Sequence, residues 1–273
     1  MKKILAILLV SIMVIMTGCT KSTSVGEKQQ STIDKVLKAK KLVVGTAPGY
    51  FPFEMKNTKG DFIGYDIDTA KAIADSLGVK VEFKQFGFDG LIPALKTGEI
   101  DMIIAGMTIR GDRALSVSFA DPYFSTGQVL MLPKKDTTTK SWEELDKPGK
   151  KIAVSLGTTG ALLAKQIFKN AEVKDFEDFP AASMALIQGQ ADGIIYDEPG
   201  IRSYEGMNPG SVRGVYDLIS KENLGIAVRK DDLETVQWLN SFVSSYKGSP
   251  KELESFAKWF ENVDWMKEVE QKK

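Results

Sequence analysis

The sequence predicts an α/β protein whose two similar lobes are joined by two crossing strands. Its segments "ALKTGEIDMII" (94–104) and "ALIQGQADGII" (185–195) match at Ala, Leu, Gly, Asp, Ile and Ile with a constant offset of 91 residues, 185 minus 94. Strand-like and helix-like patterns alternate in each half of the chain, which favours parallel-rich sheets covered by helices. The length of 273 residues also exceeds the usual size of one domain. These observations predict two domains of like construction.

The first lobe is expected to start with a buried strand, because "LVVGT" (42–46) is a short apolar run closed by Gly and Thr. Residues 66–78 follow as a helix that ends at Gly78. Residues 79–84 alternate apolar and charged side chains, so they predict a strand with one polar face. The helix places four apolar residues on one face: Ile67, Ala70, Ala74 and Leu77.

The second lobe repeats this order. "KIAVS" (151–155) predicts its first strand, a helix starts at Thr159, and residues 173–179 predict a second strand. The second copy of the repeat then supplies a helix and the strand "DGIIYD" at 192–197. Each copy of the repeat carries a Gly where the chain must leave its helix.

Two strand-like runs, 127–133 and 224–230, bracket the second lobe. We expect the chain to cross over and to return at these runs, which then act as a hinge. The expected lobe boundaries are 32–127 with 224–273 for the first lobe, and 128–223 for the second.

The C-terminal segments 233–243 and 252–260 predict helices that pack back on the first lobe. The second of them spaces four apolar residues as i, i+3, i+4 and i+7: Leu253, Phe256, Ala257 and Phe260. The tail "ENVDWMKEVEQKK" (261–273) contains Trp265, to which the sequence assigns no role.

Composition excludes several functions. Lys plus Arg equals Asp plus Glu at 36 each, so no excess of positive charge attracts a polyanion, and we expect no nucleic-acid partner. The chain has no histidine, which removes the commonest general base and the commonest metal ligand. A His-dependent hydrolase is therefore excluded, and we expect neither a bound metal nor a cofactor.

The N-terminal segment has the features of an export signal. Lys2 and Lys3 precede an apolar run from Ile4 to Met16, which is too short for a membrane span. "MTGC" at the end of this run resembles a bacterial lipobox, which implies that residues 1–18 are removed and that Cys19 carries lipid. Residues 19–31 then read as a polar tether.

Small-molecule sites in open α/β folds lie at the carboxyl ends of strands. After the first predicted strand, "TAPGYFPFE" holds Tyr50 and Phe51 on a stiff loop, where they either line a pocket or fill the core. After the third strand, "AGMTIRGDR" offers backbone groups and an arginine whose planar fork fits a carboxylate. In the second lobe, "LGTTG" brings amides to a helix N-terminus, and Asp197 in "YDEP" suits a cation.

These motifs, in this order, resemble the polar amino-acid family of extracytoplasmic solute-binding proteins that feed ABC importers. The resemblance covers roughly residues 40 to 262 and includes "GYDIDTAKAIADSLGVKVEF", "FDGLIPALKTGEIDMIIAGMTIRGDR", "FADPYFSTGQVL" and "LGIAVRKDD". It implies a periplasmic-binding-protein-like fold of type II, an amino-acid ligand, an ABC permease as partner, and no catalysis. We expect a monomer that is attached to the membrane only by its lipid.

The resemblance also implies roles for individual residues. Arg113 grips the α-carboxylate of the ligand with the amides of Thr108 and Thr159. Asp197, the Gly106 carbonyl and the Thr108 hydroxyl receive the α-ammonium group. Arg110 is expected to face solvent, so the embedded "RGD" is not an adhesion signal. The full expected set of ligand-binding residues is Tyr50, Phe88, Ala105, Gly106, Thr108, Arg113, Ser155, Thr158, Thr159 and Asp197, with Tyr50 and Phe88 enclosing the ligand's side chain.

The identity of the ligand depends on two departures from the family pattern. Binders of basic amino acids commonly carry an acid where this chain has Ala47, and glutamine binders place Lys where this chain has Ser155. Because neither charge is present, a neutral amino acid is favoured. Two rival functions stay open on the same fold: a dehydratase that acts on cyclic carboxylic acids, and the ligand-sensing domain of a receptor.

Overall fold

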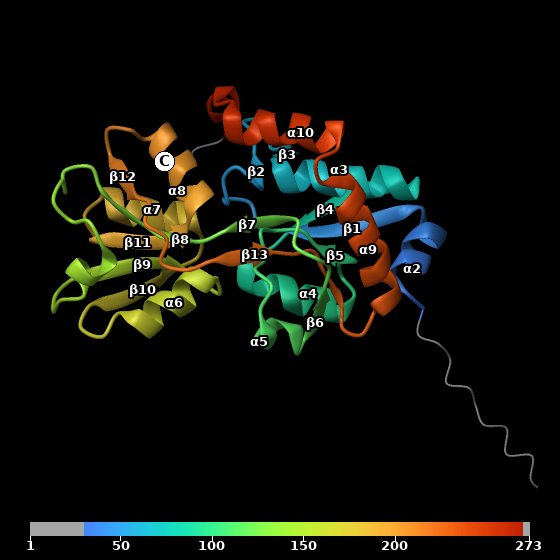
Figure 1. Cartoon of the computed structure of the whole chain (residues 1–273), viewed down its shortest axis with the longest axis horizontal. Helices are drawn as coiled ribbons and strands as arrows, with labels where there is room; N and C mark the ends of the chain where they lie inside the picture. The colour runs from blue at the N-terminus through green and yellow to red at the C-terminus, as the bar shows by residue number, and fades with distance from the viewer. Residues whose placement is uncertain (1–29, 270–273) are drawn as a thin grey trace, which may run out of the picture. The chain divides into compact units, whose positions relative to one another are not determined.

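The computed structural model describes residues 30–269, which contain two five-stranded mixed sheets (Figure 1). The first sheet has the order β4-β1-β5-β14-β6, and we call the elements around it the first lobe. The second has the order β10-β9-β11-β8-β12 and defines the second lobe. Their strands are β1 (Lys41–Thr46), β4 (Lys80–Gln85), β5 (Met102–Ile103), β6 (Val117–Phe119) and β14 (Ala227–Arg229) in the first sheet, and β8 (Gln128–Pro133), β9 (Lys151–Ser155), β10 (Glu172–Phe176), β11 (Gly193–Asp197) and β12 (Val212–Val215) in the second.

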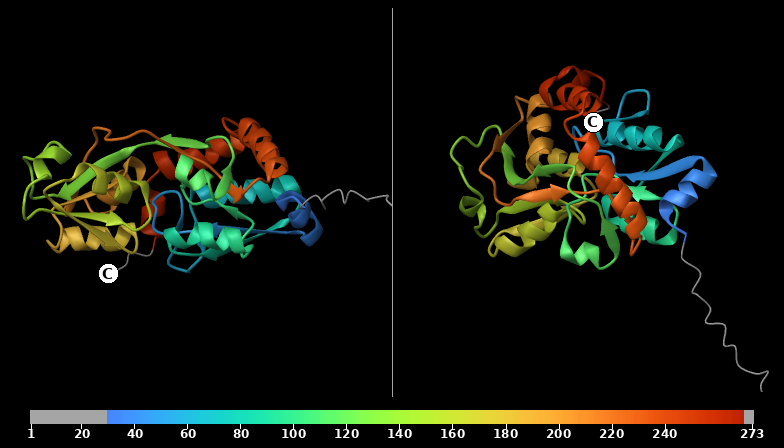
Figure 2. Two further views of the ribbon diagram at one scale, coloured as in Figure 1. Left: turned by 90° about the horizontal axis from the view of Figure 1, so that it is seen from below. Right: turned by 45° about the vertical axis from the view of Figure 1, so that its right-hand side comes forward.

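Helices cover both faces of each sheet, as the two views of Figure 2 also show. In the first lobe, α3 contacts β1 and β4, whereas α4 contacts β1, β5 and β14. In the second lobe, α6 and α7 both contact β9 and β11, and α8 packs on β8, β11 and β12. The helices are α2 (Thr32–Ala39), α3 (Tyr65–Leu77), α4 (Leu91–Thr97), α5 (Gly111–Ala114), α6 (Thr159–Ile167), α7 (Phe179–Ile187), α8 (Glu198–Met207), α9 (Leu233–Tyr246) and α10 (Pro250–Phe256).

Short elements complete the described part of the chain. The hairpin of β2 (Met55–Lys56) and β3 (Phe62–Ile63) lies in the first lobe, directly before α3. The single helical turns are η1 (Phe88–Gly90), η2 (Trp142–Leu145), η3 (Ala257–Glu261) and η4 (Asp264–Lys267).

The crossing strands lie a few residues before the runs that the sequence favours. β7 (Phe124–Thr126) and β13 (Glu222–Leu224) pair antiparallel outside both five-stranded sheets. The predicted runs themselves end up inside the sheets, as β8 and β14. The runs 127–133 and 224–230 are apolar because β8 and β14 are buried on both faces of a sheet. Their apolar character therefore does not indicate where the chain crosses between the lobes.

The internal repeat is confirmed at the level of structure. β1, β4 and β5 pair parallel in the first lobe, as β9, β10 and β11 do in the second, and each set is flanked by an antiparallel strand. The two repeat glycines, Gly98 and Gly189, adopt left-handed φ angles of 76° and 74° just after α4 and α7. Only glycine adopts this conformation readily, which explains why both copies carry one.

The expected helix faces are largely found. Ile67, Ala70 and Ala74 of α3 are buried, and Gly78 ends the helix with a left-handed φ of 63°. α9 and α10 contact α2, α3 and β6, so they pack on the first lobe as predicted. Leu253 is an exception: its side chain is 56% exposed, because α10 turns its buried residues Glu252 and Ser255 inward instead.

Candidate functional site

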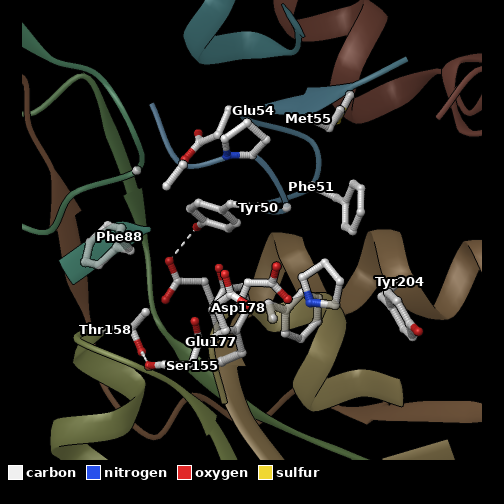
Figure 3. A pocket seen from close by; sticks show the side chains of 18 of the residues that line it. Tyr50, Phe51, Glu54, Met55, Phe88, Ser155, Thr158, Glu177, Asp178 and Tyr204 are labelled. Carbon is white, nitrogen blue, oxygen red and sulfur yellow. Dashed lines mark hydrogen bonds between the residues drawn. The ribbon is translucent and has the colours of Figure 1, made fainter. Parts of the chain in front are cut away.

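A cavity of about 250 Å³ lies between the lobes at the carboxyl ends of β1, β9 and β11 (Figure 3). Its wall includes eight of the ten residues that the sequence singled out: Tyr50, Phe88, Gly106, Thr108, Ser155, Thr158, Thr159 and Asp197. Ala105 is 1% exposed and belongs to the core cluster beneath α4. Arg113 does not line this cavity; its guanidinium carbon lies over the ring of Phe88, which does, 5.2 Å from the centre of that ring.

Tyr50 and Asp197 connect the two lobes across the cavity. The Tyr50 hydroxyl donates a hydrogen bond of 2.5 Å to Asp197 Oδ2, drawn as a dashed line in Figure 3. The amide of Gln128 donates to the other oxygen of Asp197. Burial, followed by the negative charge of Glu222, raises the pKa of Asp197 to about 7, although the hydrogen bonds and Arg113 oppose this shift. Asp197 is therefore a buried carboxyl group that a cation inside the cavity would ionise.

The Tyr50 ring fixes the identity of residue 106. Gly106 has a φ of 53°, and a Cβ atom at this position would lie 2.2 Å from the ring. The Gly106 amide donates to Asp66 Oδ2 at 2.7 Å. Asp66 also accepts the hydroxyl of Tyr123, and burial raises the pKa of Asp66 to about 6. The Gly106 amide is therefore already hydrogen-bonded within the first lobe, whereas the Gly106 carbonyl takes no part in these hydrogen bonds to Asp66.

Arg113 bridges the lobes with its planar guanidinium group. Nη1 donates to the Thr108 carbonyl at 2.9 Å and Nη2 to the Gly157 carbonyl of the second lobe at 3.1 Å. Burial lowers the pKa of Arg113 to about 10, with Arg110 adding to the effect. Arg110 itself is exposed and pairs with Asp112 at 3.0 Å. The two neighbouring arginines therefore lie in different surroundings, as expected.

Thr108 and Thr159 lie between two cavities, an arrangement that the sequence did not predict. Both hydroxyls donate to Glu222 Oε2, at 2.6 and 2.7 Å, and Ser220 donates to Oε1 at 3.1 Å. The two threonines line the main cavity and also a second one beyond them, whereas Glu222 lines only the second. Because their hydrogens point to Glu222, the hydroxyl oxygens offer lone pairs to the main cavity. Glu222 was missed because it begins the crossing strand β13, whereas the rule applied to the sequence considers only the carboxyl ends of strands.

The N-terminus of α6 supplies the remaining predicted polar groups. Thr158 is its N-cap: the side chain accepts from the Ala161 amide at 3.2 Å and donates to the Ser155 carbonyl at 2.7 Å. Thr159 begins the helix, and the first amides of a helix have no partner within it. These amides and the helix dipole favour an anion at this point of the wall.

Several lining residues lie outside the predicted set. Glu177 and Asp178 follow the end of β10, so the same strand-end rule would have found them, but residues 173–179 were assigned to a strand. Phe179 stacks on Tyr196 with ring centres 4.1 Å apart. Phe51, which the sequence left open between pocket and core, also lines the cavity. The other lining residues that were missed include Glu54, Met55, Lys56, Pro180, Met184, Tyr204, Met207 and Val269.

The described residues contain no group of three or more His, Cys, Asp or Glu that could hold a metal ion. Over the same range, 30–269, no helix has the length and apolar character needed to cross a membrane. Cys19, the signal segment 1–18 and most of the tether 19–31 lie outside the described residues.

The chain belongs to the bacterial extracellular solute-binding proteins, family 3, whose model matches residues 42–262. The predicted family and fold class are thereby confirmed. A glutamine-binding protein of an ABC transporter from Bacillus subtilis is 33% identical over 273 residues, which span 95% of this chain and 97% of the relative. A probable histidine-binding protein from Neisseria gonorrhoeae is 34% identical over 77% of this chain and 80% of its own length.

Solved structures of the same fold also match. A binding component of an ABC transporter from Wolinella succinogenes, described as putative and solved with lysine, is 36% identical with a TM-score of 0.80, over 84% of this chain and 99% of the other. An ancestral amino acid-binding protein, described as a precursor of cyclohexadienyl dehydratase, is 40% identical with a TM-score of 0.80, over 84% of this chain and all of the other.

Proposed function

We propose that this chain binds an L-amino acid between its lobes and delivers it to an ABC import permease. One observation carries the proposal: two buried groups of opposite charge lie at the cavity, one from each lobe. Asp197 of the second lobe lines it, and Arg113 of the first lobe lies over the ring of the lining residue Phe88 and donates to the Thr108 carbonyl. A zwitterion such as an α-amino acid complements both charges at once. The names of the relatives, which bind histidine, glutamine or lysine, agree with this ligand class.

One group of site residues binds the ligand's carboxylate and another binds its ammonium group. Arg113 exchanges its carbonyl partners for the ligand carboxylate, which also meets the amides of Thr108 and Thr159 at the start of α6. The ammonium group pairs with Asp197 and donates to the Thr108 hydroxyl, whose lone pairs face the cavity. Tyr50 and Gln128 each donate to one oxygen of Asp197, and a carboxylate has further lone pairs, so the ammonium group can join these two donors.

The side chain of the ligand is neutral or cationic. The expectation of a neutral side chain rests on Ala47 and Ser155, and both line the cavity. Glu177 and Asp178 also line it and supply negative charge that this expectation did not consider. Lys56 is the lining lysine, and it lies over the Phe62 ring at 5.0 Å. An acidic amino acid would meet an excess of carboxyl groups, so we expect L-aspartate and L-glutamate to be rejected.

Binding without catalysis is favoured over the rival functions. The lining groups are fixed charges, hydroxyls and aromatic rings, and the ancestral neighbour related to a dehydratase is itself described as an amino acid-binding protein. The crossing strands β7 and β13 let the lobes open and close around a ligand, which suits capture and release.

A thermal-shift screen of residues 31–273 against the common amino acids tests the function. A ligand at 100 times its dissociation constant adds about 2.7 kcal/mol of stability. We expect one neutral or cationic amino acid to raise the melting temperature, with no change from L-glutamate. If no amino acid stabilises the protein at millimolar concentration, the proposal is wrong.

Membership of an extracellular family implies a site of action outside the cytoplasm. We propose further that Cys19 is lipidated, with palmitate among its acyl chains, and that this lipid anchors a monomer to the membrane. Cys19→Ser should leave a protein that either keeps its signal segment or is released. Membrane fractionation with a mass measurement distinguishes the outcomes, and a fully processed mutant that stays on the membrane would contradict the lipid anchor.

A further inference from the structure

The C-terminal segment Asp264–Val269 lies beyond the residues that the family model matches, yet it is fixed to the first lobe. Trp265 is buried, and its indole N–H donates to the Trp259 carbonyl at 3.0 Å. The rings of these two tryptophans lie 6.0 Å apart. Figure 1 shows this turn, in red, at the end of α10 nearest to α8. Trp265 is therefore an anchor for the residues that follow it.

Beyond Trp265, the segment pairs with the hairpin loop of the first lobe. The Thr58 amide donates to the Glu268 carbonyl at 2.8 Å, and Asn57 forms an antiparallel bridge with Val269. Val269 is 6% exposed and lines the main cavity. Asn57 directly follows Met55 and Lys56, which also line it. The segment thus supplies part of the cavity wall that the family match does not include.

The same segment also reaches the second lobe. A Cβ atom built on Gly206 of α8 would lie 3.1 Å from Met266 Cε and 3.4 Å from its sulfur. The absence of a side chain at Gly206 lets Met266 approach this closely. Met207, the next residue, lines the cavity, and Met266 packs against the same apolar cluster as Val269. One short segment therefore contacts both lobes, in addition to the crossing strands β7 and β13.

We propose that Asp264–Val269 is a strap that closes the apolar end of the cavity and holds the two lobes together around the ligand. Opening the lobes must separate Met266 from α8, because Trp265 and Glu268 keep the strap on the first lobe. Met266 buries apolar surface that opening returns to water, which favours the closed state. The strap therefore slows ligand release, and dissociation rates account for most affinity differences among related complexes.

The strap is tested by two variants: a chain that ends at Val263, and Met266→Ser in the full chain. Wild type and variants are titrated with L-glutamine, L-histidine and L-arginine, and stopped-flow fluorescence measures dissociation of the tightest-binding probe. We expect Met266→Ser to release the probe about tenfold faster and the truncated chain to release it faster still. Lys267→Ala is the matched control, since this neighbouring side chain is 80% exposed and its ammonium pairs with Asp264 of the same turn at 3.0 Å.

A second measurement needs no ligand. Small-angle X-ray scattering of the ligand-free protein should give a larger radius of gyration for both strap variants than for wild type and Lys267→Ala. The dissociation arm rests on the proposed function, whereas the scattering arm does not: if wild type binds none of the three probes, none of them is the ligand and scattering still decides the strap. Equal radii, or dissociation rates of Met266→Ser within twofold of wild type, would overturn the strap, even if the truncated chain fails to fold.

Discussion

In the first lobe, the repeat aspartate Asp101 accepts a hydrogen bond from the Val43 amide at 2.9 Å, and in the second its counterpart Asp192 accepts one from the Lys151 amide at 2.9 Å. Each aspartate also binds a lysine ammonium, at 2.7 and 2.8 Å. The two lobes therefore repeat not only their strands but also a side-chain contact. This contact ties the residue before β5 or β11 to the neighbouring parallel strand, β1 or β9.

At the cavity the likeness ends. The first lobe supplies Tyr50 and Arg113, whereas the second supplies the start of α6 and Asp197. Corresponding strand ends thus carry different chemistry on the same framework. The comparison separates two classes of residue: framework residues, which build a lobe, and site residues, which distinguish the two ends of a ligand. Substitutions in the two classes should therefore have different effects.

The largest effect is expected at Arg113. Its planar fork makes contacts with carbonyls of both lobes, and lysine cannot reproduce this geometry. Arg113→Lys should lose about 2 to 5 kcal/mol of binding free energy, a factor of tens to thousands in affinity. Arg110→Lys is the matched control, because an exposed charge contributes at most about 1 kcal/mol. Calorimetric titration compares them, and an equal or greater loss at Arg110 would mean that the wrong arginine is assigned.

The second lobe's charge should matter almost as much. Asp197→Asn keeps the shape but removes the partner of the ammonium group, which costs about 2 to 5 kcal/mol of binding free energy. Affinity within twofold of wild type would remove Asp197 from the site.

The same residue predicts a pH dependence. The pKa of Asp197 is raised to about 7, so below that pH the carboxyl of the ligand-free protein is protonated, and binding of the ammonium must release that proton. Affinity should fall about tenfold per pH unit below 7. Tyr50, Gln128, Arg113 and Glu222 are the groups that face Asp197 and set this value. In Asp197→Asn the profile should become flat over this range, and an unchanged slope would assign the titration to another group.

The contrast between framework and site also explains what the sequence could predict. The strands, the helices and the two-lobe fold follow from local periodicity and from the repeat, which are properties of neighbouring residues. The strand-end rule placed Tyr50 and Asp197 at the cavity, because the ends of parallel strands share an edge. Arg113 needed the family resemblance, since α5 is a single turn without periodicity of its own.

Residues that act through contacts distant in the sequence were missed. Glu222 meets Thr108 across 114 positions, and no local pattern indicates such a contact. Trp265 received no role because its value lies in holding Val269, which pairs with Asn57 far away in the chain. Its own hydrogen bond reaches only back to Trp259 and shows no pattern in the sequence. Leu253 was assigned to a buried face because apolar spacing alone cannot say that α10 buries Glu252, which accepts the Tyr65 hydroxyl at 2.7 Å.

A smaller effect, on stability alone, tests the framework class. Asp101→Ala removes a side chain that is 4% exposed and leaves the half-buried Val43 amide without its acceptor, which costs about 1 to 3 kcal/mol of unfolding free energy. Asp192→Ala should cost less than about 1 kcal/mol, because the Asp192 side chain is 33% exposed and water can replace it. Denaturant unfolding measures both. Ligand affinity should change in neither variant, and a greater loss of stability at Asp192 would contradict the comparison.

The smallest effect concerns Glu222, which lies between the two classes. It does not line the main cavity but accepts the hydroxyls of two residues that do, Thr108 and Thr159. Glu222→Gln replaces the carboxylate that accepts both threonine hydroxyls with a neutral amide. Hydrogen bonds to a neutral acceptor are about half as strong, so the two hydroxyls are oriented less firmly. We expect about 1.4 kcal/mol of lost binding free energy, tenfold in affinity, for the best amino acid.

The analogue of that amino acid without its α-ammonium group should bind the Glu222→Gln variant as well as it binds wild type, because it makes no use of the hydroxyl lone pair. Glu252→Gln is the control. Glu252 is 7% exposed, much like Glu222 at 8%, and it too accepts a side-chain hydroxyl, that of Tyr65, but far from the cavity. Calorimetry of both ligands against both variants decides the role. If Glu222→Gln weakens the amino acid and its analogue alike, Glu222 supports the crossing strand and does not orient the site.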